Sequence, residues 1–362
     1  MIAVILGTRP EIIKMSPIIR ECEARNLDYF ILHSGQHYSY DMDAVFFENL
    51  RLPDPKYQLD VGSGPHGQQT GRMLAGIEEI LQKESPDCVV VLGDPNTPLA
   101  GALAAAKLQI PVCHVEAGRR SCNRRMPEEI NRIIIDHISD GLCTPTKVTR
   151  ENLLKEGIDE KKIIVTGDPI VDAVSENLAV AREGSTVLQD LDLTPKGYLL
   201  VTVHRAENTD AKERLQGILT ALRDISTSLS LPVVFPVHPR TERKIREFGL
   251  SMNGILQTGP LGYLDFLQLE ANARLILTDS GCIQEESCIL CVPCVTLRDD
   301  TERPETLMVG SNVLAGTDPD HISSAALMML SEDRKWKNPF GDENAGKRIV
   351  QYIHSLEAKS WT

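Results

Sequence analysis

The chain has 362 residues, of which 42% are hydrophobic and 25% are charged, and its formal net charge at pH 7 is −13. This composition is typical of a soluble globular protein, and the length predicts two domains of about 150 residues each. The negative charge argues against nucleic acid and anionic membrane surfaces as main partners. Aromatic residues make up only 4% of the chain, so we do not expect platforms that stack single-stranded bases either.

The start of the chain and its cysteines favour a cytoplasmic protein. Residues 1–6 have the pattern of a short strand that leads directly into a loop, unlike a signal peptide, and no apolar run reaches transmembrane length. The nine cysteines, an odd number, fall largely within helix and strand patterns. Reduced thiols explain this distribution better than a disulfide framework does.

Four cysteines, Cys282, Cys288, Cys291 and Cys294, fall within thirteen residues, and the last three have the spacing C-x2-C-x2-C. This spacing also occurs in iron–sulfur proteins. The surrounding pattern predicts a helix at 283–290 and a strand at 293–297, so these three would lie on different elements, whereas cluster ligands usually share one wrapping loop. We therefore expect four small packed positions and no metal.

The first half of the chain alternates short apolar runs with helical patterns, which predicts a parallel, doubly wound sheet. Strands are expected at 2–6, 29–34, 88–92, 111–115, near 142 and at 162–165. Helices are expected from 10 to about 25, at 68–83, at 96–107, from 127 onward and at 147–156. Residues 53–67 hold three prolines and three glycines, so we expect a flexible loop there.

The alternating pattern starts again after Gly167-Asp168-Pro169, where we place the domain boundary. The expected domains are 1–170 and 171–345, with a C-terminal helix at 346–362. A helix at 171–182 leads across the boundary, and residues 183–197 are polar and rich in turns. The expected elements that follow are strands at 198–203, 232–237, 275–278 and 293–297 and helices at 263–270, 283–290, 318–330 and 343–358. The fold class is therefore α/β, with two Rossmann-like domains.

Acidic side chains follow two of the predicted strands. Asp94 comes after 88–92, and Glu116 comes after 111–115 and precedes a loop with four arginines, Arg119, Arg120, Arg124 and Arg125. Pro127 then opens a helix with Glu128 in its first turn. Because ligands bind at the carboxyl ends of strands in open α/β sheets, this pattern predicts an anionic substrate that also undergoes proton transfer.

Each of these residues also has a purely structural interpretation. Asp94 can cap the helix that follows it. Glu116 can form a structural bridge with a nearby arginine. Glu128 and Arg132 are four residues apart on a helix, so a surface ion pair is the default interpretation for them. The site hypothesis gains from all of these residues meeting at one edge of the sheet.

Basic and polar residues follow other strands. Arg9 lies beside the N-terminus of the first predicted helix, which is a natural anion site, whereas Lys14, one turn further, is by itself typical of a solvated basic face. His204 follows the strand at 198–203 and, taken alone, is equally a core or capping histidine. Residues 279–286 pass from a strand into a helix, and backbone amides at such a turn can hold a phosphate.

Several ordered blocks of the chain resemble the non-hydrolysing UDP-N-acetylglucosamine 2-epimerases. They are GDPNTPLAGALAA at 93–105, HVEAG at 114–118 and MPEEINR at 126–132, and the resemblance extends from GTRPEIIK at 7–14 to NPFGDENAGKRI at 338–349. It implies two domains of the GT-B type with the active site in the cleft between them, and a final helix that crosses back onto the first domain. It also implies reversible epimerisation at C2 of UDP-N-acetylglucosamine, for surface polysaccharide precursors.

The resemblance also implies a role for each candidate residue. The implied catalytic residues are Asp94, Glu116, Glu128 and His204. The implied substrate-binding residues are Arg9, Lys14, Arg132, Leu261, Phe266, Ser280, Gly281, Cys282, Glu286 and Arg303. Gln36, Gln69 and His238 are implied to bind UDP-N-acetylglucosamine as an activator. The resemblance implies a cytoplasmic homodimer that needs no metal and no cofactor.

Four positions depart from the pattern of the family. The chain has Pro95 and Asp300 where Thr is usual, Arg119 where Leu is usual, and Cys282 in the phosphate turn where Gly is usual. We expect Cys282 to matter most, because a side chain there would crowd the nucleotide or be incompatible with a positive φ.

Other functions fit parts of the same pattern. A related UDP-2,3-diacetamido sugar is an alternative substrate, and a hydrolysing epimerase that releases N-acetylmannosamine is a close alternative. A glycosyltransferase on the same scaffold is an alternative from another enzyme class. A nucleotide-sugar sensor without catalysis is the alternative outside enzymes, and it would account for Arg119 and Cys282.

Overall fold

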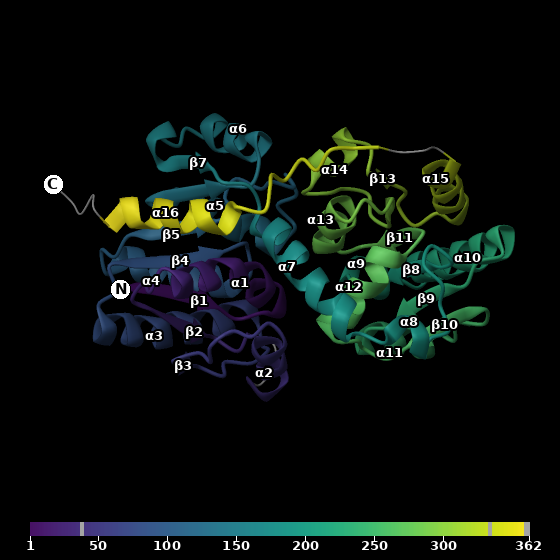
Figure 1. Ribbon diagram of the computed structural model, residues 1–362, viewed down its shortest axis with the longest axis horizontal. Coiled ribbons are helices and arrows are strands. Elements are labelled where there is room, and N and C mark those ends of the chain that lie inside the picture. The colour runs from purple at the N-terminus through teal and green to yellow at the C-terminus, as the bar shows by residue number, and fades with distance from the viewer. Residues whose placement is uncertain (37–39, 332–334, 358–362) are drawn as a thin grey trace. The chain divides into compact units, whose positions relative to one another are not determined.

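The computed structural model describes residues 1–36, 40–331 and 335–357, and the chain forms two compact units (Figure 1). Only the backbone is described for residues 40–43 and 357. The first unit comprises Met1–Ser175 and Phe340–Thr362, and the second comprises Glu176–Pro339. Each unit is built on its own parallel sheet with helices between successive strands, so the predicted α/β class with two doubly wound domains is confirmed.

The first unit contains a seven-stranded sheet of order β3-β2-β1-β4-β5-β6-β7. Its strands are β1 (Ile2–Leu6), β2 (Tyr29–His33), β3 (Tyr57–Gln58), β4 (Cys88–Leu92), β5 (Val112–Val115), β6 (Gly141–Thr144) and β7 (Ile163–Val165). Both β1 and β4 are buried along their whole length, as expected of central parallel strands covered on both faces. Strand β3 lies inside the segment predicted to be a flexible loop, because two residues are too few to give a strand pattern.

The helices of the first unit cover both faces of this sheet. They are α1 (Arg9–Ala24), α2 (Tyr40–Asn49), α3 (His66–Glu84), α4 (Asn96–Lys107), α5 (Pro127–Ile138), α6 (Lys147–Lys155), a short 3-10 helix at Glu160–Lys162, the start of α7 (Pro169–Gly184) and α16 (Ala345–Glu357). Helices α3, α4 and α5 pack in series on one face. Helix α16 packs against α1 and lies along the sheet of this unit (Figure 1).

The second unit contains a six-stranded sheet of order β10-β9-β8-β11-β12-β13. Its strands are β8 (Leu199–Thr202), β9 (Val233–Pro236), β10 (Ile255–Thr258), β11 (Leu275–Thr278), β12 (Cys294–Thr296) and β13 (Asn312–Leu314). Its helices, after the end of α7, are α8 (Val187–Asp190), α9 (Ala206–Thr209), α10 (Lys212–Leu229), α11 (Pro239–Phe248), α12 (Tyr263–Asn272), α13 (Gly281–Ile289), α14 (Pro304–Met308) and α15 (Pro319–Ser331). Alternate residues of β8 enter two different hydrophobic clusters, because Leu199 packs with α10 and α15 whereas Leu200 packs with α8 and α12.

The register of the parallel strands brings pairs of turns side by side. Leu92 at the end of β4 pairs with Val115 at the end of β5, so Asp94 and Glu116 follow adjoining strand ends. In the second unit Thr202 of β8 pairs with Thr278 of β11, so the segments 203–208 and 279–281 also adjoin. Both pairs of turns lie at a carboxyl edge, where open α/β sheets bind ligands.

The clustered cysteines lie on separate elements, as predicted. Cys288 lies in α13, Cys291 in the turn after it and Cys294 in β12. Burial raises the pKa of Cys288 to about 11 and that of Cys294 to about 12, so these thiols stay protonated at neutral pH. None of the described helices has a stretch that is long and apolar enough to cross a lipid bilayer.

Glu11, in the first turn of α1, is a carboxyl group buried inside the first unit, with only 1% of its surface exposed. Its Oε2 accepts hydrogen bonds from the Thr8 hydroxyl at 2.6 Å and from the Gly7 amide at 3.3 Å. Its Oε1 has no hydrogen-bond partner among the described residues. Burial, helped by the nearby negative charge of Asp94, raises the pKa of Glu11 to about 8 despite these two hydrogen bonds.

Replacing Gly118 with alanine is expected to lower the thermal unfolding midpoint well beyond the loss caused by Gly157→Ala. Both glycines have a left-handed backbone, with φ of +80° and +82°, which costs about 1–2 kcal/mol for other residues. A Cβ on Gly118 would also lie 2.2 Å from the Thr149 carbonyl oxygen, whereas a Cβ on Gly157 would meet no atom within 4 Å. Calorimetry of both variants measures the difference, and equal losses would show that the Thr149 contact relaxes freely.

The buried carboxyl of Glu11 predicts a stability that falls as the pH rises. The folded protein keeps the proton up to about pH 8, whereas the unfolded chain releases it near the ordinary pKa of 4.5, so stability is lost between these values. Glu11→Gln removes this titration, and its unfolding midpoint should exceed that of the wild type at pH 8 but not at pH 4.5. Glu21→Gln, on the same helix, is the control, and parallel midpoint curves for all three proteins would contradict the prediction.

Candidate active site

Glu116 occupies a strained position at the end of β5. Its φ is +66°, in the left-handed region that favours glycine, and its side chain is only 5% exposed. A left-handed conformation costs about 1–2 kcal/mol for a residue with a Cβ, and such strain collects at functional sites. The carboxylate of Glu116 lies in a cluster of charged side chains.

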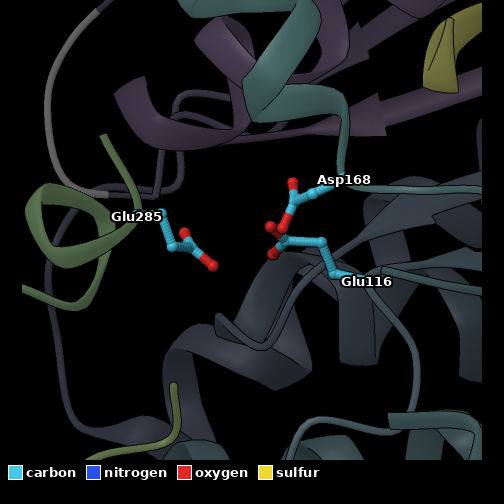
Figure 2. A group of neighbouring side chains, drawn as sticks. All are labelled: Glu116, Asp168 and Glu285. Carbon is cyan, nitrogen blue, oxygen red and sulfur yellow. The ribbon is translucent and has the colours of Figure 1, made fainter. Parts of the chain in front are cut away.

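Two cations approach the same oxygen of Glu116. The Lys14 ammonium lies 2.5 Å from Oε1, and the guanidinium of Arg119 lies 3.5 Å from it. Arg119 also binds Asp168, which follows β7, and Figure 2 shows the carboxyl groups of Asp168 and Glu116 side by side. Glu285, drawn in the same figure, belongs to the second unit. Lys14 is 3% exposed, so the solvated basic face considered for it is excluded.

Asp94 is bound by an arginine of helix α5. Arg132 reaches Asp94 Oδ2 with two nitrogens, at 2.6 and 2.7 Å. The residue before α4 is Pro95, which has no side-chain cap, and the Gln36 side chain accepts the amide of Thr97 in the first turn of this helix. The Asp94 side chain remains 25% exposed.

The ion pair expected between Glu128 and Arg132 forms with Glu129 instead. Arg132 Nη1 lies 2.6 Å from Glu129 Oε2. Burial alone would raise the pKa of Glu129, but the backbone amides of Ser121 and Cys122 together with Arg132 hold it below the usual range. Glu129 therefore anchors the arginine-rich loop, whereas Glu128 is half-buried and has no ion pair with any described residue.

A histidine that sequence reasoning did not single out ties the two acid-bearing turns together. His114 Nδ1 lies 2.7 Å from Asp136 Oδ1, and its Nε2 lies 2.9 Å from the Gly93 carbonyl oxygen. Asp136 Oδ2 accepts the Gly118 amide at 3.1 Å. The only sequence signal for this role was a histidine within an otherwise apolar, buried strand.

The structure joins two of the predicted regulatory residues in one hydrogen-bond network. The amide nitrogen of Gln69 donates to the Gln36 carbonyl oxygen at 2.7 Å, and the Gln36 side chain accepts the Thr97 amide at 3.0 Å. Asn96 donates to Gln69 Oε1 at 2.8 Å, and Asn131 bonds both to Asn96 and to the Asp94 carbonyl oxygen. The network therefore links Gln36 and Gln69 to the turn that carries Asp94. Gln36 and Gln69 are 4% and 5% exposed.

Arg9 begins helix α1 at the same edge of the sheet. It is half-buried, and its guanidinium lies over the Phe46 ring, 5.0 Å from the centroid. The edge thus combines Arg9, Lys14, Asp94, Glu116 and Arg132, all predicted from sequence, within the first unit.

In the second unit a buried aspartate holds His204. Asp279 follows β11 and lies 3.0 Å from His204 Nδ1, and it also accepts the backbone amides of His204 and Arg205. Burial opposes the negative charge, but these hydrogen bonds together with Asn208 hold the pKa of Asp279 below its usual range. The His204 side chain is 45% exposed, and its ring centroid lies 6.4 Å from that of His238.

The turn from β11 into α13, predicted to bind a phosphate, has a glycine at 281. Ser280 precedes helix α13, and a Cβ on Gly281 would lie 2.6 Å from the Arg303 guanidinium. Arg303 is fixed there by Glu302 at 2.6 Å and by Glu285 at 3.3 Å. Cys282 lies within α13 at a negative φ and is half-buried, so the expectation that its side chain conflicts with a positive φ is wrong.

The remaining candidates surround this turn. Leu261 and Phe266 are half-buried and pack against the cluster of β8, α12 and α13. Glu286, in the second turn of α13, is 5% exposed and lies next to the fully buried Glu270 of α12. Burial and the charge of Glu286 raise the pKa of Glu270 well above its usual range. The structure therefore gathers Leu261, Phe266, Ser280, Gly281, Cys282, Glu286 and Arg303 in one region of the second unit.

Comparison with known proteins identifies relatives over nearly the whole chain. The family model for UDP-N-acetylglucosamine 2-epimerase matches residues 20–354. The UDP-N-acetylglucosamine 2-epimerase of Methanocaldococcus jannaschii is 53% identical, covering 97% of this chain and 98% of the relative. Its crystal structure in complex with UDP-GlcNAc and UDP superposes with a TM-score of 0.92, covering 98% of this chain and 99% of that one.

A further relative has a different substrate in its name. The UDP-2,3-diacetamido-2,3-dideoxy-D-glucuronate 2-epimerase of Pseudomonas aeruginosa is 43% identical, covering 98% of this chain and 99% of the relative. The match of the family model, the identity over the full length and the two-sheet fold agree with the sequence blocks at 93–105, 114–118 and 126–132. The chain belongs to the UDP-N-acetylglucosamine 2-epimerase family.

Proposed function

We propose that this chain interconverts UDP-N-acetylglucosamine and UDP-N-acetylmannosamine by elimination and re-addition of UDP, and that the product serves surface polysaccharide synthesis. The observation that carries the proposal is the arrangement of Asp94 and Glu116. These two carboxylates follow adjoining strand ends, and each is held by a cation. Membership of the epimerase family supports the same reaction.

The chemistry explains why several carboxylates are needed. The proton on C2 of the sugar has no neighbouring carbonyl group, so direct abstraction would be slow. In the elimination a carboxylate takes this proton, the electron pair of the C2–H bond forms the C1=C2 double bond, and the C1–O bond breaks to release UDP. The intermediate is 2-acetamidoglucal, and UDP adds back to C1 while a proton is delivered to the opposite face of C2.

Residues of the first unit act on the sugar. Asp94, Glu116 and Glu128 supply the acid and base groups, and Lys14 and Arg132 hold two of them in place. Arg9, at the start of α1, contributes a cation for the diphosphate.

Residues of the second unit bind UDP. The N-terminal amides of α13 and the Arg303 guanidinium beside Gly281 offer donors to the diphosphate, and His204, held by Asp279, offers another. Glu286 accepts hydrogen bonds from the ribose hydroxyls, and Leu261 and Phe266 bind the uracil. Cationic groups on a leaving diphosphate stabilise the charge that develops as the C1–O bond breaks.

A UDP-2,3-diacetamido uronate is the second candidate substrate. The Pseudomonas aeruginosa relative named for such a sugar is 43% identical over nearly the whole chain, and Arg119 adds a cation near Glu116. Assays with both nucleotide sugars separate the two candidates by their relative kcat/KM.

The reaction predicts incorporation of solvent hydrogen at C2. Incubation with UDP-N-acetylglucosamine in deuterated water, without added metal or nicotinamide, should give UDP-N-acetylmannosamine with deuterium at C2, measured by NMR and mass spectrometry. Glu116→Gln should lower the rate by about 10²-fold or more, because an amide cannot exchange the proton. Glu151→Gln, an exposed pair partner of Arg150, is the matched control and should react normally.

Two results would contradict this prediction. Product without deuterium would exclude the elimination, and free N-acetylmannosamine with UDP would point to a hydrolysing enzyme. A near-normal rate for Glu116→Gln would leave Glu116 as a structural ion-pair partner only.

Regulation by UDP-N-acetylglucosamine is expected through Gln36, Gln69 and His238. The network from Gln36 and Gln69 to the Asp94 turn offers a physical route in the first unit. UDP-N-acetylmannosamine alone should react slowly until a little of the other epimer is added. Gln69→Leu should weaken this activation, whereas Gln82→Leu on the exposed side of the same helix should not. Hyperbolic kinetics without a lag in both directions would count against an activator site.

A further inference from the structure

Arg119 is a buried cation that departs from the family pattern and lies beside Glu116. It is 3% exposed, and its guanidinium hydrogen-bonds to Asp168, which is fully buried. The turn Glu116-Ala117-Gly118 returns the chain on itself, so that Arg119 comes back to within 3.5 Å of Glu116 Oε1. A guanidinium with so little exposure is stable only when negative groups compensate it.

Both partners in this ion pair are held rigidly. Asp168 donates its backbone amide to the Phe340 carbonyl oxygen at 2.9 Å, and its Oδ1 accepts the Ile170 amide at 3.0 Å. Arg119 follows Gly118, and the backbone of Gly118 packs so closely against the Thr149 carbonyl group that a Cβ would not fit between them. The guanidinium therefore occupies a fixed place, unlike a lysine or arginine on a solvated surface.

The charges around Glu116 form a cluster that contains both signs. Lys14 from α1 and Arg119 from the same turn face Oε1, and Asp168 compensates Arg119. The other oxygen, Oε2, lies on the side of Gly93, 3.5 Å from where a Cβ on that glycine would be. The Asp94–Arg132 pair and the buried Glu11 lie at the same edge of the sheet.

We propose that Arg119, fixed by Asp168, is a positioning residue for Glu116. Arg119 is the second cation, after Lys14, that holds Glu116 Oε1, and Glu116 thereby presents its Oε2 to the C2 proton of the sugar. This inference rests on the proposed epimerisation. A fixed cation favours the ionised form of a neighbouring carboxylate, which is the form that accepts a proton. The structural alternative is that the Arg119–Asp168 pair only fastens the loop to the start of α7.

A double variant separates these two roles. Arg119→Leu removes the Arg119 partner of the buried Asp168, and Asp168→Asn leaves Arg119 with less compensation, so each should lower the thermal unfolding midpoint. Arg119→Leu with Asp168→Asn removes both charges and should recover most of that midpoint, because neutral groups can replace a buried ion pair with little loss. The recovered double variant reports on Glu116 without a folding defect.

The double variant is expected to change how Glu116 titrates. The midpoint for protonation of the Glu116 carboxyl, followed by NMR of ¹³C-labelled glutamate and assigned with Glu116→Gln, should rise by roughly a few tenths of a pH unit, because the lost Arg119 cation lay 3.5 Å from Oε1 and the lost Asp168 charge offset part of its effect. The acid limb of the kcat/KM profile should rise with it, and kcat at neutral pH should fall about tenfold. An unchanged titration midpoint would overturn the proposal.

Two further variants test the charge itself. Arg119→Lys keeps a cation and should titrate closer to the wild type than the double variant does, and a shift as large as that of the double variant would contradict the proposal. Arg125→Leu removes an exposed arginine of the same loop and should leave the Glu116 midpoint unchanged. The NMR measurement needs no turnover. If the wild type fails to epimerise UDP-N-acetylglucosamine, the proposed reaction fails, while the titration still decides the role of Arg119.

Discussion

The hydrogen bonds of His114 hold the first unit's candidate site together. This side chain leaves β5 and joins the Gly93 carbonyl oxygen to Asp136, and Asp136 in turn accepts the Gly118 amide. The two turns that carry Asp94 and Glu116 are therefore tied to one buried pair. The parallel register makes this possible, since Leu92 and Val115 lie side by side at the ends of β4 and β5. If this tie were lost, neither carboxylate would keep its position relative to the other.

Burial of charge constrains the rest of this edge. Glu116 and Glu129 are nearly inaccessible to water, and each has a cation within hydrogen-bonding distance. Removing one partner of a buried pair costs about 3–5 kcal/mol, so these residues are held in fixed places. Glu11 meets the same constraint differently, since its raised pKa keeps it neutral at physiological pH. At this edge the charged carboxylates are paired with cations, and the buried acid without a cation takes up a proton on folding.

The departures from the family pattern have different consequences. Cys282 adds no backbone strain, because its φ is negative, and the Arg303 guanidinium packs against the neighbouring Gly281. Arg119 instead adds a charge to the group around Glu116, and Asp168 compensates it. A change at a half-buried helical position is tolerated locally, whereas a change that buries a charge requires a partner elsewhere in the chain.

The sequence by itself determined the fold class, the family and most of the residues at the two sheet edges. Buried parallel strands give continuous apolar runs, and the polar residues that follow them, such as Asp94, Glu116 and Asp279, stand out by contrast. Short edge strands such as β3 carry no such pattern and were not predicted.

The partners of the charged groups were also decided only by the tertiary structure. Arg132 lies close to both Glu128 and Glu129 in sequence, but only Glu129 faces it inside the unit. Asp168 lies far from Arg119 along the chain, and His114 acts through side-chain hydrogen bonds between strands and turns. Such pairings depend on which side chains come together when the strands and helices pack into the folded unit. The spacing of residues along the sequence does not specify these tertiary contacts.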